Sequence, residues 1–144
     1  MIVLDTNVLS EVLRPSPSKQ VLDWLEGQEA DTVYITAITQ AEMLYGIEVL
    51  PQGRRKRHLA AALAQIFSEE FRGRVLPFDE ECPAPFAKIV AMRRASGHPI
   101  SQSDAMIAAI ARSRGAVVAT RNSIDFVDCG LRLVNPWEEE KRAS

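Results

Sequence analysis

Residues 1–13 read MIVLDTNVLSEVL, and this stretch places a carboxylate where an apolar strand ends. Residues 2–4 are typical of a buried strand, and the apolar residues between Val8 and Leu13 recur at helical spacing. Asp5 lies between these two elements. Open α/β sheets bind their ligands beyond the carboxyl ends of the strands, so Asp5 is a candidate functional residue.

The composition is that of one globular domain, with 144 residues of which 47% are hydrophobic and 25% are charged. No apolar run approaches the ~20 residues that span a bilayer, and Asp5 interrupts what would be the core of a signal peptide. We therefore expect a cytoplasmic protein. Cys82 and Cys129 are too few for a disulfide framework or a cysteine zinc site. The net charge of −2 does not by itself indicate a nucleic-acid-binding protein.

Apolar runs alternate with helical patterns along the chain, which predicts an α/β fold with a parallel sheet covered by helices. The expected strands are residues 2–4, 32–36, 74–78, 116–120 and 131–134. The expected helices are residues 18–28, 39–50, 58–71, 85–95 and 101–114. We interpret residues 1–137 as a single domain and residues 138–144 as a short charged tail.

Three acids fall near strand ends or helix starts in this pattern. Asp5 ends the first strand, Glu42 lies near the start of the helix after the second, and Asp104 near the start of the helix before the fourth. Taken singly, each fits a helix start, and TQAE around Glu42 is typical of a capping box. Together they predict a carboxylate cluster in which mutual repulsion raises the pKa values. Oxygen ligands without paired histidines or cysteines indicate Mg²⁺ or Mn²⁺.

Four motifs, in this order, resemble the PIN-domain ribonucleases, in particular the VapC and FitB toxins of bacterial toxin–antitoxin pairs. They are MIVLDTNVLSE (1–11), ITAITQAEMLYGI (35–47), SQSDAMIAAIA (101–111) and VATRNSIDF (118–126). The resemblance implies a PIN-like three-layer sandwich with a central, mainly parallel sheet of four or five strands. It also implies a Mg²⁺-dependent endoribonuclease, the toxin of a type II pair, that cleaves RNA with a metal-activated water.

By this resemblance, Asp5, Glu42 and Asp104 match the metal-binding and catalytic acids of the family. The fourth acidic position is open, because some relatives carry an acid directly after TR, where this chain has Asn122. We include Asp125 among the catalytic residues and expect a short helix from Asn122, capped by its side chain. Mg²⁺ is the expected cofactor, with Mn²⁺ as a substitute. The expected supporting residues are Thr6, Asn7, Thr120 and Asn122.

Basic and apolar residues indicate partners. GRRKRH at 53–58 places cations at or just before a predicted helix, as an RNA-backbone contact or as a solvated loop. The expected RNA-binding residues are Arg54, Arg55, Lys56 and Arg121, with Arg93 and Arg94 extending the rim. An aromatic content of 6% does not indicate base-stacking platforms. The resemblance implies a small antitoxin and a homodimer, and the apolar residues 43–49 are either a partner contact or core.

Two other functions fit a small α/β domain. A phospho-receiver signalling domain would use Asp79 after the third strand and Thr120 after the fourth. It also needs a second acid beside Asp5 and a lysine directly after the last strand, whereas here Asp5 stands alone and the last strand runs into Asn135 and Pro136. A catalytically silent PIN-like binding module is the second alternative, and an assay for metal-dependent ribonuclease activity distinguishes it.

Overall fold

The computed structural model describes residues 1–138 as an α/β fold with a five-stranded sheet in the order β3-β2-β1-β4-β5. All neighbouring strands in it are parallel. The strands are β1 (Ile2–Leu4), β2 (Val33–Thr36), β3 (Val75–Leu76), β4 (Val117–Ala119) and β5 (Leu133–Val134). The predicted sheet is confirmed, although four strands are shorter than expected. Of the expected tail, residues 139–144 lie outside the described residues.

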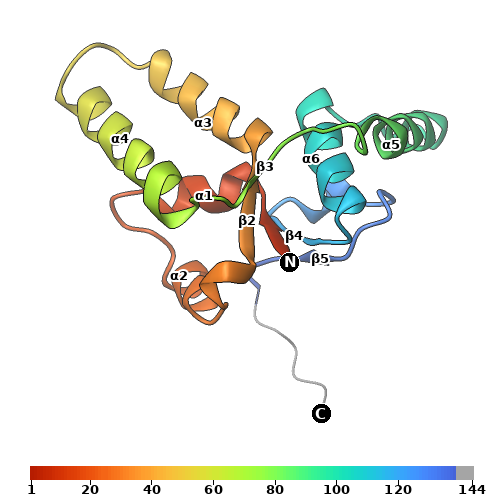
Figure 1. The fold of residues 1–144 in the computed structure, drawn as a ribbon, viewed down its shortest axis with the longest axis horizontal. Helices are drawn as coiled ribbons and strands as arrows, with labels where there is room; N and C mark the ends of the chain where they lie inside the picture. The colour runs from red at the N-terminus through yellow and green to blue at the C-terminus, as the bar shows by residue number, and fades with distance from the viewer. Residues whose placement is uncertain (139–144) are drawn as a thin grey trace.

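Within the described residues, six α-helices flank the sheet (Figure 1). They are α1 (Thr6–Val12), α2 (Lys19–Glu26), α3 (Ala37–Glu48), α4 (Arg54–Gln65), α5 (Pro83–Ala95) and α6 (Gln102–Ser113). Three shorter helical segments are η1 (Ala30–Thr32), η2 (Ile66–Glu70), which prolongs α4, and η3 (Ser123–Phe126). None of the helices in this part of the chain is long and apolar enough to cross a membrane.

The sheet separates two apolar cores because successive strand residues point to opposite faces. On one face, Val3 of β1 packs with residues of α5 and α6 and with Phe126 of η3. On the other face, Leu4 packs with residues of α1 and α2 and with the segment that follows α4. The predicted three-layer sandwich follows from this division. It leaves the carboxyl ends of the central strands between the two helical layers.

Helix α3 begins two residues earlier than the TQAE motif predicts. Its N-cap is Thr36, whose Oγ1 accepts a hydrogen bond from the backbone N–H of Thr39 at 3.1 Å. Glu42 therefore lies in the second turn, and the capping-box interpretation of Thr39 and Glu42 is wrong. Helix α6 begins as predicted, because Ser101 Oγ accepts a hydrogen bond from the backbone N–H of Asp104 at 3.2 Å.

Helix α4 also begins earlier than predicted, at Arg54, so the basic motif forms its first turn instead of preceding it. Cations at this end oppose the helix dipole. Lys56 relieves part of this conflict because its Nζ donates a hydrogen bond to the backbone carbonyl of Glu48, where α3 ends, at 3.1 Å. The basic turn thus lies at the outer end of the α3–α4 pair.

Arg93 is buried in the structure and cannot extend an exposed basic rim. Its Nε donates to the carbonyl of His98 at 2.7 Å, and its Nη1 donates to the carbonyls of Asp125 and Val127, each at 2.9 Å. These bonds tie α5 to η3 and the turn after it. Arg93 therefore fixes the backbone of the segment that carries Asp125.

We predict that Arg93→Met lowers the free energy of unfolding by about 3 kcal/mol, because it leaves three carbonyls without their charged donor. Urea unfolding measures the loss. Arg94→Met is the matched control, since Arg94 is exposed on the same helix and its replacement should change stability by less than about 0.5 kcal/mol. Equal effects of the two substitutions would contradict the structural role of Arg93.

Candidate active site

The carboxyl ends of β1 and β4 open into a pocket of about 460 Å³. Asp5, Glu42 and Asp104 all line it, each from a different element, so the three acids converge as the sequence predicts. The other residues that line the pocket are Thr6, Asn7, Ser10, Glu11, Arg14, Arg121, Asn122 and Trp137. With Glu11, four carboxylates therefore border this pocket.

Asp5 is the most constrained of these acids. It is only 6% exposed, its Oδ1 accepts a hydrogen bond from the backbone N–H of Thr6 at 2.8 Å, and its Oδ2 accepts one from Thr120 Oγ1 at 2.9 Å. Burial raises the pKa of Asp5 to about 6, against the effect of these two hydrogen bonds. The charges of Asp104 and Glu42 add to the rise, so the expected repulsion is present but is smaller than the cost of burial.

Thr6 links the first strand to α3. Its Oγ1 donates a hydrogen bond to Glu42 Oε1 at 2.8 Å and lies 3.0 Å from Thr39 Oγ1. Glu42 is exposed to the pocket solvent. The threonine directly after Asp5 therefore orients a second carboxylate, Glu42, which lies 36 positions further along the chain than Thr6.

Asp104 stands on the first turn of α6, where Ser101 fixes the helix start. Burial raises its pKa, the hydrogen bond with Ser101 lowers it, and the charges of Asp125 and Glu42 raise it further. Asp125 is thus close enough to influence Asp104 electrostatically. It does not line the pocket, whereas Asn122 does.

Thr120 organises the supporting residues. Besides its bond to Asp5, its Oγ1 accepts hydrogen bonds from the backbone N–H of Asn122 at 3.1 Å and from Asn7 Nδ2 at 3.4 Å. Asn7 Oδ1 in turn accepts from the backbone N–H of Arg121 at 3.3 Å. The helix expected after Asn122 exists as η3, but the side chain of Asn122 makes no capping hydrogen bond to it. The predicted cap is therefore wrong, and Thr120 and Arg93 hold this segment instead.

Glu11 is a pocket residue that the sequence analysis missed. It is 7% exposed, pairs with Arg14 Nη1 at 3.1 Å, and accepts a hydrogen bond from the backbone N–H of Ser18 at 3.1 Å. The hydrogen bond from Arg14 holds the pKa of Glu11 below its ordinary value. The helical spacing could have indicated this position, because Glu11 lies three residues after Val8 and so falls on the buried face of α1.

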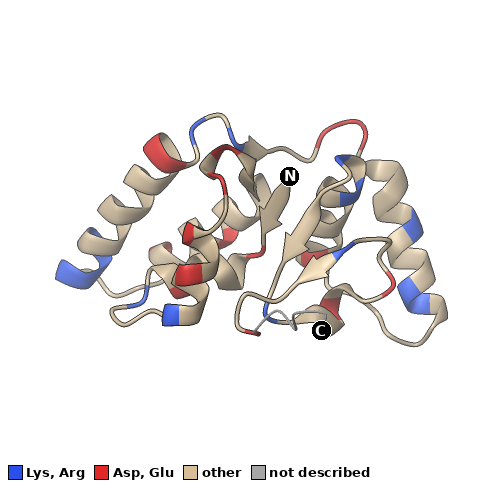
Figure 2. Cartoon of the chain, turned by 90° about the horizontal axis from the view of Figure 1, so that it is seen from below, with Lys and Arg blue, Asp and Glu red and all other residues tan. Residues whose placement is uncertain are grey.

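The four predicted RNA-binding residues separate into two places. Arg121 lines the pocket. Arg54, Arg55 and Lys56 lie in the first turn of α4, where Figure 2 shows basic residues at the outer end of the helix. This basic turn is a second surface, separate from the pocket lining.

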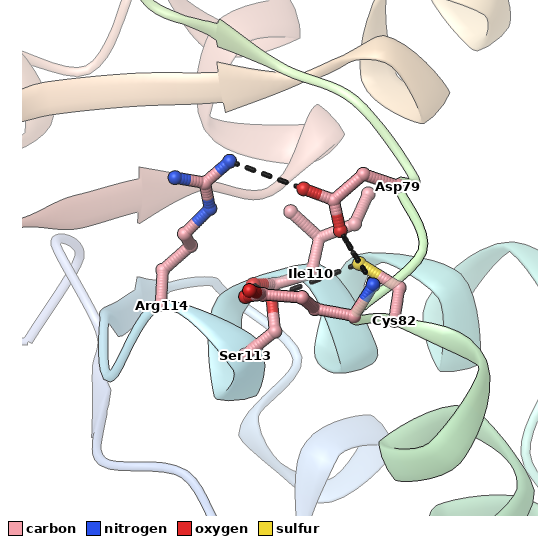
Figure 3. Close-up of polar contacts among 6 residues, drawn as sticks. Asp79, Cys82, Ile110, Ser113 and Arg114 are labelled. Atoms are coloured by element: carbon pink, nitrogen blue, oxygen red, sulfur yellow. Dashed lines mark hydrogen bonds and ion pairs between the residues drawn. The ribbon is translucent and has the colours of Figure 1, made fainter.

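Asp79, the acid that a phospho-receiver would use, does not line the pocket. It lies beside Arg114 and Cys82 instead (Figure 3). Its Oδ2 is 3.3 Å from Arg114 Nη2, and its Oδ1 accepts a hydrogen bond from Cys82 Sγ at 3.4 Å. Asp104 and Arg114 are at opposite ends of α6, about 15 Å apart along the helix axis. Asp79 therefore joins the loop before α5 to the far end of α6 and has a structural contact of its own.

The pocket offers the oxygen ligands that Mg²⁺ and Mn²⁺ prefer. In residues 1–138, no group of three His, Cys, Asp or Glu side chains is arranged to hold a metal ion directly. Mg²⁺ commonly binds proteins through one or two carboxylates and keeps several waters, a mode that suits acids spread around a solvent-filled pocket. Asp5, Glu42 and Asp104 form no ion pair with any described Lys or Arg. The donor set thus fits a hydrated divalent cation.

Comparisons with known proteins cover nearly the whole chain. Residues 2–128 match the PIN domain family. Plasmid stability protein StbB of Pseudomonas syringae pv. tomato is 44% identical, over 96% of this chain and 99% of the relative. VapC ribonuclease Y4jK of Sinorhizobium fredii is 41% identical over the same shares. The solved structure of FitAB bound to an IR36 DNA fragment is similar with a TM-score of 0.93 and 40% identity, and the match covers 99% of both chains.

The raised pKa of Asp5 predicts that the metal-free protein loses stability as the pH rises from about 4 to about 6. In this range the folded protein keeps a proton on Asp5 that the unfolded chain, with an ordinary aspartate pKa near 3.9, has lost. The loss is at most about 3 kcal/mol, because one pKa unit corresponds to about 1.4 kcal/mol.

Urea unfolding in EDTA at about pH 4 and at about pH 6 measures this loss of stability. Asp5→Asn removes the titrating group, so the variant should lose much less stability over the same interval than the wild type. If the two proteins respond equally to pH, burial of Asp5 does not raise its pKa in this way.

Proposed function

The chain belongs to the PIN domain family and is a ribonuclease toxin of the VapC/FitB type, and we propose that it hydrolyses RNA in the pocket formed by Asp5, Glu42 and Asp104. The observation that carries this proposal is the convergence of Asp5, directly after β1, with Glu42 of α3 and Asp104 of α6. The phospho-receiver interpretation is wrong for a PIN-domain chain, and Asp79 has its own partner in Arg114.

In this proposal, Asp5, Glu42 and Asp104 hold Mg²⁺, with Mn²⁺ as a substitute, directly or through water. A divalent ion there supplies an activated water and stabilises negative charge on the phosphate. The chain's own residues orient the acids: Thr120 and Thr6 fix Asp5, and Thr6 also fixes Glu42. Because these contacts exist before substrate binds, the carboxylates need little rearrangement for the reaction.

Asp125 supplies a fourth negative charge in this proposal. Its charge acts on Asp104, and its backbone is fixed through Arg93. Asn122 faces the pocket and contributes a neutral amide. The two residues therefore have different roles, one electrostatic and one in contact with the pocket.

RNA contacts in this proposal follow the distribution of cations. Arg121 binds at the pocket, where the cleaved linkage lies, and Arg54, Arg55 and Lys56 bind the backbone further away. Contacts of this kind with phosphates fix the position of the strand without reading its sequence. The basic turn of α4 therefore contributes affinity rather than chemistry.

Two apolar surfaces support the two protein partners that we propose. Leu44 and Tyr45 on α3 and Val49 at its C-cap are exposed, Tyr45 at 70%. This exposure favours a partner contact over the core for part of residues 43–49. On α5, Phe86 and Val90 line a second apolar depression. The relative FitAB was solved as a complex bound to DNA. We propose that a cognate antitoxin and a second copy of this chain cover these surfaces, and that the protein acts in the cytoplasm.

We predict that Asp5→Asn, Glu42→Gln and Asp104→Asn each lower Mg²⁺-dependent RNA cleavage by at least about a hundredfold, since changes one shell further out already cost 10- to 100-fold. EDTA should abolish cleavage by the wild type. Glu48→Gln is the matched control, an exposed acid on α3 outside the pocket, and should cleave normally. Cleavage that resists EDTA, or that survives all three substitutions, would refute the proposed site.

The roles of Asp125 and Asn122 can be separated. Asp125→Asn should lower the cleavage rate by about tenfold or more. Asn122→Ala should change the free energy of unfolding by less than about 0.5 kcal/mol, since its side chain caps nothing.

Adding Asn122→Asp to Asp125→Asn restores a charge at the pocket and should recover most of the rate. Cleavage rates and urea midpoints of the single and double variants decide this. If Asn122→Ala abolishes cleavage while Asp125→Asn does not, the two roles are reversed.

A further inference from the structure

We propose that Arg121 and Trp137 form a nucleobase-stacking site at the rim of the carboxylate pocket, which selects RNA with an unpaired base beside the cleaved phosphate. This inference rests on the proposed ribonuclease function and adds the class of RNA that is bound. Both residues line the pocket together with Asp5, Glu42 and Asp104. The guanidinium carbon of Arg121 lies 5.2 Å from the centre of the Trp137 ring, a cation–π contact.

The backbone holds this pair in place. The N–H of Arg121 donates to Asn7 Oδ1 and its carbonyl accepts from Asn135 Nδ2, each at 3.3 Å. Asn135 Oδ1 accepts a hydrogen bond from the N–H of Trp137 at 2.9 Å. One side chain, Asn135, thus joins the turn after β4 to the turn after β5. Trp137 is also partly buried against the core on the α1 and α2 side of the sheet.

The charge of Arg121 remains available despite the acidic surroundings. Arg121 forms no ion pair with a described carboxylate, and the nearby Glu11 is already paired with Arg14. Its guanidinium instead lies over an aromatic ring. Guanidinium and aromatic planes are the surfaces on which proteins stack the bases of single-stranded RNA. The pair therefore combines a stacking surface with a positive charge next to the site of cleavage.

This arrangement favours unpaired over paired RNA. A base inside a helix already stacks on its neighbours, whereas a base in a loop or at an end can turn its face to the protein. A contact between Arg121 and a phosphate alone would serve both kinds of RNA. Stacking on the pair predicts that the base itself contributes to binding, which can be measured.

The test is a double-mutant cycle between the protein and the RNA. The bond that the wild-type protein cleaves in a hairpin RNA is mapped first, and each flanking base is then removed in turn to give abasic RNAs. Dissociation constants are measured by fluorescence anisotropy in the Asp5→Asn protein, with and without Trp137→Leu, which keeps apolar contact with the core. We expect Trp137→Leu and one abasic position each to weaken binding by about 5- to 100-fold, and their combination to weaken it no further.

Tryptophan emission gives a second readout. In a Trp24→Phe background Trp137 is the only tryptophan of the chain, and its emission should be quenched by the intact RNA but not by the critical abasic RNA. Trp137→Phe keeps an aromatic ring and should retain most of the affinity. This variant and the quenching measurement keep the test decisive if Trp137→Leu does not fold.

Several outcomes would overturn the inference. Additive losses, or binding that is indifferent to both changes, would make Trp137 a structural residue only. A Trp137→Leu protein that loses affinity for a protein partner but not for RNA would assign the pair to a protein interface. If the wild type cleaves RNA and the cycle is additive, only the stacking site fails. If the wild type neither binds nor cleaves RNA, the proposed function fails with it.

Discussion

The hydrogen bond from Thr120 to Asp5 is the contact on which the pocket depends. The parallel register pairs Leu4 with Ala119, so the next residue of each strand, Asp5 and Thr120, leaves the sheet beside the other. The same register lets the N–H of Asp5 bond to the carbonyl of Ala119 at 2.9 Å. A buried carboxylate is costly unless donors are aimed at it. Here the strand register places the hydroxyl of Thr120 beside Asp5, and the N–H of Thr6 is the second donor. Thr6 also donates to Glu42, so the same segment positions two of the three acids.

Within residues 1–138, the arginines around the pocket each contact another group, so none of them forms an ion pair with Asp5, Glu42 or Asp104. Arg14 pairs with Glu11, Arg93 is satisfied by backbone carbonyls, and Arg121 lies over Trp137. An arginine paired directly with Asp5 would lower the pKa of that acid and occupy the space between the carboxylates. The pocket thus keeps its negative potential although basic residues stand close by. A divalent cation is the partner that such a potential favours.

The sequence was sufficient for the features that depend on periodicity and on short-range order. The alternation of strands and helices predicted the parallel sheet, and positions at strand ends and helix starts predicted the convergence of Asp5, Glu42 and Asp104. The errors arose where a tertiary contact overrode a local motif. TQAE has the spacing of a capping box, yet Thr36 caps α3 and Glu42 bonds to Thr6 instead. Arg93 was expected to be exposed, but it is buried because it bonds to the backbone carbonyls of Asp125 and Val127, which lie far from it in the sequence.

Other features left little trace in the sequence. The position of Trp137 beside the pocket depends on where β5 ends relative to β1, and no local sequence pattern predicts this. The low aromatic content did not indicate a base-stacking surface, and the surface that we propose depends on a single ring, Trp137, at the rim of the pocket. The start of α4 was also missed, because the basic run does not resemble a favourable first turn until the carbonyl of Glu48 is considered. Long-range geometry decided each of these cases.

The pairing of β1 with β4 also means that the proposed active site is built from the first and the last parts of the chain to be synthesised. β1 is made first, but its neighbour β4 spans residues 117–119, and Thr120 follows it. Contacts between such distant parts of a chain form late in folding. A nascent polypeptide that stops short of residue 117 lacks the strand that completes the floor of the pocket and the donor that holds Asp5. A chain that ends before residue 117 therefore lacks part of the proposed active site, and only nearly complete chains contain all of it.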